Sequence, residues 1–197
     1  MPMPPVGNYL DFEFTFCATR GRTWPAVHLL ANNFQHDVVT IGHSNLSVHV
    51  RMCLNSDVNN IAIGYFNKRE SETIIEQGQI VADQSLELVS IHVDGILLEP
   101  WFWTQGTYTP EYFIGYLKQV PNAPKELPSQ LIWHFPGRFT IRNLPGGCKF
   151  WDWYHHERTA RVLKDLVDPT GQILANFDPL DDSDKKLIKD IKKLIDV

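Results

Sequence analysis

The sequence predicts a mainly β protein, a jelly-roll-like antiparallel β-sandwich with a C-terminal helical appendage. Three observations support this prediction. Apolar and polar residues alternate along residues 9–17 and 46–54, as they do in strands buried on one face. Two further apolar segments, 61–66 and 85–93, flank a long polar loop, and the Asp-Gly pair after the second is a strong turn signal. The apolar period becomes helical only after about residue 152.

These patterns divide the chain into three segments. Residues 1–8 carry three prolines and a glycine and are expected to form an extended N-terminal arm. Residues 9–145 are expected to form the β-sandwich domain, and residues 146–197 a helical C-terminal segment. The expected strands are residues 9–17, 27–32, 38–41, 46–54, 61–66, 85–93, 131–135 and 138–144.

The alternating positions also predict which side chains fill the core. Large apolar residues take every second place in the best strands, so one face of each strand is expected to be buried. The segment from residue 69 to 83 carries four acids without sustained alternation, and we expect a functional loop there at one end of the sandwich. The expected core residues are Phe12, Phe14, Leu46, Val48, Val50, Ile61, Ile63 and Ile91.

Composition and charge exclude several classes of partner. The chain has a net charge of −5 and no basic stripe, so no nucleic-acid partner is expected. It contains no stretch of about 18 apolar residues, so no membrane-spanning helix is expected, and its first residues lack the pattern of a secretory signal. Cys17, Cys53 and Cys148 form no CxxC pair, which is typical of plain thiols in a reducing compartment.

No arrangement of residues predicts catalysis. The GxSxG, P-loop, GxGxxG, HExxH and CxxC motifs are absent from the sequence. Asp152 and His156 are four residues apart and could share a helix face, but two ligands do not make a metal site. A polar helix surface or a subunit contact explains that pair better. We therefore expect no enzyme, no metal and no cofactor.

Two groups of apolar residues are candidates for binding. Four aromatic residues could serve as stacking surfaces for a glycan, although core filling and interface burial are the competing explanation. The stripe on a helix expected at residues 183–195 is too apolar to stay in water, so it either folds back or docks on a neighbouring subunit. We favour the neighbour. The glycan candidates are Trp101, Trp103, Tyr108 and Tyr112, and the assembly candidates are Leu187, Ile188, Ile191, Leu194 and Ile195.

The polar segment and its flanking strands carry a recognisable pattern. The chain has Y-F-N-K at residues 65–68 and D-Q-S-L-E-L-V-S-I-H-V-D-G at residues 83–95. This resembles calcium-dependent carbohydrate-binding modules of the xylan-binding type, which carry F-x-N-D, a loop, and then D-R-N-L-x-V-D-x-I-x-V-x-G. The apolar skeleton matches, and so do Asn67, Asp83 and Gly95.

Two departures from that pattern bear on calcium. Lys68 stands where the first motif has an acid, and Val89 stands where the second motif has its second Asp. Calcium prefers several oxygen ligands, and neither residue supplies one from its side chain. The resemblance therefore implies a jelly-roll-like sandwich over about residues 25–100 and a glycan as a ligand, but no calcium.

The same core also resembles small structural proteins of tailed bacteriophages, which combine an F-N-K segment, a loop, an acid, a strand and a D-G-I turn with a following aromatic segment. This resemblance implies a non-enzymatic structural or accessory protein of a virion, made in the host cytoplasm and built into a tail, baseplate, collar or capsid surface. Its partners would be other virion proteins and copies of itself, held through the arm and the terminal helix. The alternative is a carbohydrate-binding module with an aromatic platform.

Overall fold

The computed structural model describes residues 9–54, 58–77 and 79–166. The chain divides into two compact units, Met1–Trp151 and Asp152–Val197. The described part of the first unit is the β-sandwich. Its strands are β1 (Tyr9–Thr19), β2 (Ala26–Ala31), β3 (Phe34–Thr40), β4 (Asn45–Cys53), β5 (Asn59–Tyr65), β6 (Ile74–Glu76), β7 (Gln79–Ala82), β8 (Ser85–Val93), β9 (Ile96–Leu97), β10 (Thr107–Pro110), β11 (Leu127–Pro128), β12 (Ile132–Trp133) and β13 (Gly137–Leu144).

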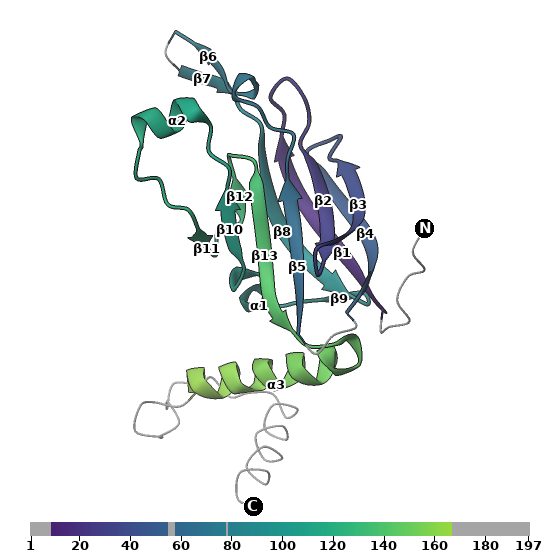
Figure 1. Ribbon diagram of the computed structural model, residues 1–197. Helices are drawn as coiled ribbons and strands as arrows, with labels where there is room; N and C mark the ends of the chain where they lie inside the picture. Colours follow the sequence, from purple (N-terminus) through teal and green to yellow (C-terminus); the bar gives the residue numbers. More distant parts are fainter. Residues whose placement is uncertain (1–8, 55–57, 78, 167–197) are drawn as a thin grey trace, which may run out of the picture. The chain divides into compact units, whose positions relative to one another are not determined.

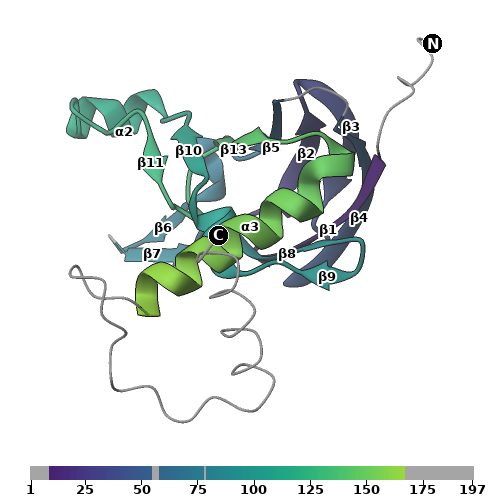
Figure 2. The ribbon, with the colours of Figure 1, turned by 90° about the horizontal axis from the view of Figure 1, so that it is seen from below.

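Two antiparallel sheets form the layers of this sandwich, as the end-on view in Figure 2 shows. The first sheet has the order β12-β8-β1-β4, with β9 paired to β8. The second sheet has the order β11-β10-β13-β5-β2-β3. A separate two-stranded hairpin, β6-β7, projects at one end, where the short helix α2 (Ile114–Gln119) also lies (Figure 1). The structure thus confirms the predicted antiparallel sandwich followed by a helix.

The core lies between the sheets and is filled by the alternating positions. The inward side chains of β1 include a row of three phenylalanines, each at most 1% exposed, which stack along the strand between the buried Leu10 and Ala18. Val48, Ile61, Ile63 and Ile91 are buried as predicted. Leu46 and Val50 face the same way but are only half-buried, because β4 is the edge strand of its sheet.

Three elements differ from the sequence prediction. Residues expected to form only an aromatic patch make the helix α1 (Pro100–Thr104), which buries Phe102 and Trp103. The segment expected to be a loop without regular structure contains a 3-10 turn (Glu70–Glu72) and the β6-β7 hairpin. The last two predicted strands are present, but β12 pairs with β8 while β13 pairs with β10 and β5. The chain therefore changes sheets at Pro136 instead of forming a hairpin there.

The long helix α3 (Gly147–Leu166) begins in the first unit and continues into the second. Within the first unit, the Phe150 ring lies edge-on to Phe12 and Phe102, and the Trp151 indole donates to a carboxylate oxygen of Asp94 at 3.0 Å. In the second unit, the hydroxyl of Thr159 donates to the carbonyl oxygen one turn before it. No helix among the described residues is long and apolar enough to span a membrane. The predicted arm and the predicted terminal helix fall outside the described residues.

Candidate functional site

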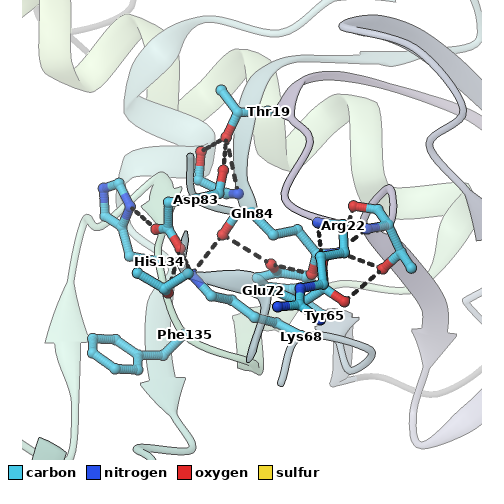
Figure 3. A network of polar contacts seen from close by, with 12 residues as sticks. Thr19, Arg22, Tyr65, Lys68, Glu72, Asp83, Gln84, His134 and Phe135 are labelled. Atoms are coloured by element: carbon cyan, nitrogen blue, oxygen red, sulfur yellow. Dashed lines mark hydrogen bonds and ion pairs between the residues drawn. The ribbon is translucent and has the colours of Figure 1, made fainter. Parts of the chain in front are cut away.

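Two polar regions of the sandwich stand out, and the first is a buried network at the end where β5 leaves its sheet and β8 begins (Figure 3). The Lys68 side chain is 1% exposed. Its ammonium donates to Oδ1 of Asp83 at 2.6 Å and to the backbone carbonyl of Gln84 at 2.7 Å. The hydroxyl of Thr73 donates to the same Asp83 oxygen at 2.6 Å. Burial lowers the pKa of Lys68, while the hydrogen bond and charge of Asp83 oppose that shift.

The second carboxylate of this network fixes a turn of the backbone. One oxygen of Glu72 accepts the backbone N–H groups of Arg22 and Thr23 at 2.6 and 2.8 Å, and the other accepts the Thr23 hydroxyl at 3.1 Å. Burial by itself would raise the pKa of Glu72. The hydrogen bonds from Thr23 and Arg22 together outweigh that effect and hold the pKa below its usual value.

Gln84 connects the two carboxylates and is fully buried. Its amide oxygen accepts the Tyr65 hydroxyl at 2.8 Å, and its amide nitrogen donates to the carbonyl and hydroxyl oxygens of Thr23 at 3.0 Å. Desolvation raises the pKa of Tyr65, so the phenol remains a donor. Each of these buried polar groups has a partner, as a stable interior requires.

This network does not fit the calcium site that the sequence resemblance would imply. The Lys68 ammonium already contacts the oxygens that a metal would need, and its positive charge repels a divalent cation. The side-chain oxygen of Asn67 accepts the backbone N–H of Ala26 at 2.7 Å, and its nitrogen donates to Trp24, so this residue ties β5 to the start of β2. Calcium would need six to eight oxygen ligands here.

The predicted glycan-binding aromatics do not come together. Trp103 is 6% and Tyr108 is 1% exposed, and the Tyr108 ring stacks on Trp133 while its hydroxyl donates to the carbonyl of Phe135. These two rings fill the core, which is the competing explanation that the sequence left open. They are buried because α1 and β10 turn them into the space between the sheets.

The other two aromatics, Trp101 and Tyr112, are half-buried. The Trp101 indole donates to Glu99 at 3.1 Å. Tyr112 stacks on Tyr116 at 5.2 Å beside α2 and lies edge-on to Phe135 at 4.9 Å. Sugar contact by Trp101 and Tyr112 stays a prediction. The assembly prediction also stays untested, because residues 187–195 fall outside the described residues.

The second polar region is a groove on the outer face of the second sheet, with a volume of about 390 Å³. The strand register places His28, Gly64, Arg138 and Thr109 in one row across β2, β5, β13 and β10. A Cβ atom at Gly64 would lie 1.9 Å from the His28 ring, so only glycine leaves room for that side chain. We call this region the Arg138 groove; its lining residues are Asn33, Asn60, Ala62, Thr109, Glu111, Arg138, Thr140 and Arg142.

Arg138 is the central charged group of this groove and is incompletely paired. Its Nη2 donates to Oδ1 of Asn33 at 2.7 Å, whereas its Nε is buried and has no acceptor among the described residues. Burial lowers the pKa of His28, and the positive charge of Arg138 lowers it further, while Glu111 acts in the opposite direction. Because its pKa is lowered, the ring of His28 is mainly uncharged at neutral pH. The groove lining has two guanidinium groups, Arg138 and Arg142, and one carboxylate, Glu111, and Arg142 also lies 3.9 Å from Glu126.

Sequence reasoning missed the Arg138 groove. Residues 138–144 were expected only to form a strand, and within β13 Phe139 and Ile141 are buried in the core. The polar half, Arg138, Thr140 and Arg142, was the available signal, since the outward positions of a strand share one face.

Comparison with known proteins gives two structural matches. One is described as vCBM60 in complex with galactobiose, with 12% identity, a TM-score of 0.45, and coverage of 68% of this chain and 98% of the other. The second is a selenomethionine form of vCBM60, from work that links two families of calcium-dependent carbohydrate binding modules by circular permutation. It shares 11% identity with a TM-score of 0.46 over 68% of this chain and 91% of the other. No family model and no curated protein matches the sequence.

Proposed function

We propose that this chain is a non-enzymatic binding protein that takes a carbohydrate in the Arg138 groove. The groove carries this proposal, because seven of its eight lining side chains can form hydrogen bonds and they converge on one concave surface. Amide, carboxylate, guanidinium and hydroxyl groups together can donate to and accept from the hydroxyls of a sugar. The volume of about 390 Å³ lies within the usual range for small-ligand sites.

An aromatic surface adjoins this groove. The Phe66 ring is 46% exposed and stacks on His28 with ring centroids 5.0 Å apart. Phe66 is the first residue after β5 and lies two positions along the chain from Gly64. An exposed ring face of this kind adds apolar contact for the C–H face of a sugar, while the lining polar groups fix its orientation.

The acid content of the groove favours binding over hydrolysis. Glycoside hydrolysis uses a pair of carboxyl groups on either side of the scissile bond. Glu111 is the one carboxylate among the lining residues of the Arg138 groove. Glu126, outside that lining, is paired with Arg142 at 3.9 Å, so the lining itself offers its recognition groups and a single acid.

The virion role expected from the sequence remains a second proposal. It depends on the arm at residues 1–8 and the stripe at residues 187–195, both outside the described residues. A glycan-binding protein can also be part of a virion, so the two proposals do not exclude each other.

Screening of the full chain against an oligosaccharide array, followed by calorimetry with the best ligand, tests the carbohydrate proposal. Arg138→Gln is expected to weaken binding at least about tenfold, because it removes a charged hydrogen-bonding group from the centre of the groove. The matched control is Arg51→Gln, an exposed arginine on the outer face of the other sheet. Unchanged affinity in Arg138→Gln, or no binding to any oligosaccharide, would overturn the proposal.

A further inference from the structure

Lys68 is an unusual residue because its positive charge lies inside the sandwich. An ammonium is a compact, strongly hydrated charge, and lysine is rarely buried unless its charge is paired. Here the ammonium has exchanged water for two protein oxygens, at 2.6 Å on Asp83 and 2.7 Å on Gln84. A carboxylate and a backbone carbonyl are also the ligand types that calcium prefers in proteins.

The groups around this ammonium come from three separate stretches of the chain. Lys68 follows β5, Thr73 lies between the 3-10 turn and β6, and Asp83 and Gln84 precede β8. The ammonium and the Thr73 hydroxyl share one oxygen of Asp83, and the other oxygen lies 3.6 Å from His134 Nδ1 beside β12. A cation at this point therefore ties the base of the β6-β7 hairpin to both sheets.

The charges around Lys68 explain why a cation is needed. Asp83 and Glu72 both act electrostatically on Lys68. Among the described residues Lys68 is the one lysine or arginine paired with Asp83, whereas Glu72 also lies in the field of Arg22. Without the ammonium, Asp83 would keep only the Thr73 hydroxyl and the exposed His134 ring as partners. The Asp83 side chain is only 23% exposed, so without its cation the carboxylate would be poorly hydrated and an unfilled cage would be unfavourable.

We propose that the Lys68 ammonium is a tethered cation that holds this oxygen cage closed without a metal ion, and that a carboxylate at position 68 converts the cage into a calcium site. The wild-type chain gains nothing from calcium, because its cage is already filled. Replacing the ammonium by a carboxylate leaves the Asp83 carboxylate, the Gln84 carbonyl and the Thr73 hydroxyl around an added acid, and water can supply the other ligands. This inference does not depend on carbohydrate binding.

Thermal unfolding of the full-length protein, in millimolar calcium and in EDTA, tests this inference. Wild type and Lys68→Arg, which keeps a cation, are expected to unfold at the same temperature in both buffers. Lys68→Asp is expected to unfold at a lower temperature in EDTA and to regain about 4 °C or more in calcium, with saturation as calcium is raised. Terbium luminescence sensitised by nearby aromatic rings should appear with Lys68→Asp and not with wild type or Lys68→Arg.

Arg51→Asp is the matched control, because it makes the same charge change on an exposed residue outside the cage. It is expected to show no calcium response. If Lys68→Asp does not fold, Lys68→Gln carries the test, since it removes the ammonium without adding charge and should also gain calcium-dependent stability. A calcium response in wild type, or none in a folded Lys68→Asp or Lys68→Gln, would overturn the inference.

Discussion

Lys68 and Arg138 are two cations of one sandwich with opposite surroundings. The Lys68 ammonium is 1% exposed and contacts a carboxylate and a carbonyl at 2.6 and 2.7 Å. Arg138 is half-buried at an open groove, has one hydrogen bond to Asn33, and keeps a buried Nε without an acceptor among the described residues. The fold supplies acceptors for the Lys68 ammonium, but it supplies none for the buried Nε of Arg138 within the described residues.

This difference separates a structural role from a binding role. Leaving a buried N–H without an acceptor costs about 1–3 kcal/mol, which the fold tolerates only when other interactions compensate for it. Functional sites are the usual places for such an imbalance, because their polar groups are arranged for a ligand and not for each other. We therefore expect Lys68 to matter mainly for stability and Arg138 mainly for binding.

The largest expected effect is on stability at Lys68. Lys68→Met should lower the free energy of unfolding by about 3–5 kcal/mol, since breaking a buried pair leaves Asp83 without its cation. The partial exposure of Asp83 favours the lower end of that range. Urea unfolding at pH 7 measures the change, with the exposed Arg51→Met as a control that should lose less than about 0.5 kcal/mol. A loss below about 1 kcal/mol at Lys68 would contradict the structural role.

The next effect concerns Glu72, in the same network. Glu72→Gln should cost about 1–3 kcal/mol at pH 7, because the carboxylate accepts two backbone N–H groups and a hydroxyl. Its folded pKa lies below the usual value of 4.5, so this stabilisation is present above pH 4.5 and is lost as the pH falls through the folded pKa.

Urea unfolding from pH 7 to pH 3 checks that dependence. Below pH 4.5 the wild type should lose stability more steeply than Glu72→Gln, so the two curves converge. Glu70→Gln, an exposed acid in the same 3-10 turn, is the control and should change stability little. Parallel curves for wild type and Glu72→Gln would show that the carboxylate has no special role.

The strands were predictable from the sequence because burial on one face imposes a period of two. Phe12, Phe14, Ile61 and Ile63 show this alternation clearly and are buried. The helix α1 was not predictable in the same way. It is one short turn whose buried residues Phe102 and Trp103 are adjacent, so it has no period to detect.

Neither polar region was predictable as a site. Lysine is almost always exposed, so the sequence showed only that Lys68 replaces an acid of the resembled motif and gave no sign of its burial. That burial follows from contacts with residues 15 and 16 positions away. The Arg138 groove joins residues from Asn33 to Arg142, which only the register of the second sheet brings together. That register pairs strands that are far apart in the sequence, so no local pattern shows which outward side chains become neighbours.

A smaller effect is expected when the Arg138 side chain is removed. Arg138→Met should leave the free energy of unfolding unchanged or raise it by up to about 1 kcal/mol, because it removes an unsatisfied buried N–H and keeps most of the apolar stem. Urea unfolding measures this, beside Lys68→Met. A loss of about 2 kcal/mol or more at Arg138 would mean that both cations are structural and would remove the contrast between them.

The smallest effect is electrostatic and concerns His28, which lies across Gly64 from Arg138 in the second sheet. Burial lowers its pKa below the usual 6.5, Arg138 lowers it further, and Glu111 raises it. Arg138→Met should therefore raise the pKa of His28, and Glu111→Gln should lower it. NMR titration of the His28 ring in wild type, Arg138→Met and Glu111→Gln measures both pKa shifts. Each variant controls for the other, because an unspecific loosening of the groove would shift the pKa of His28 in the same direction in both. Since the folded pKa of His28 is below its unfolded value, protonation favours the unfolded chain, and this contribution to stability falls as the pH drops below 6.5. Shifts of equal sign in the two variants would show that the charges of Arg138 and Glu111 do not act on one shared groove.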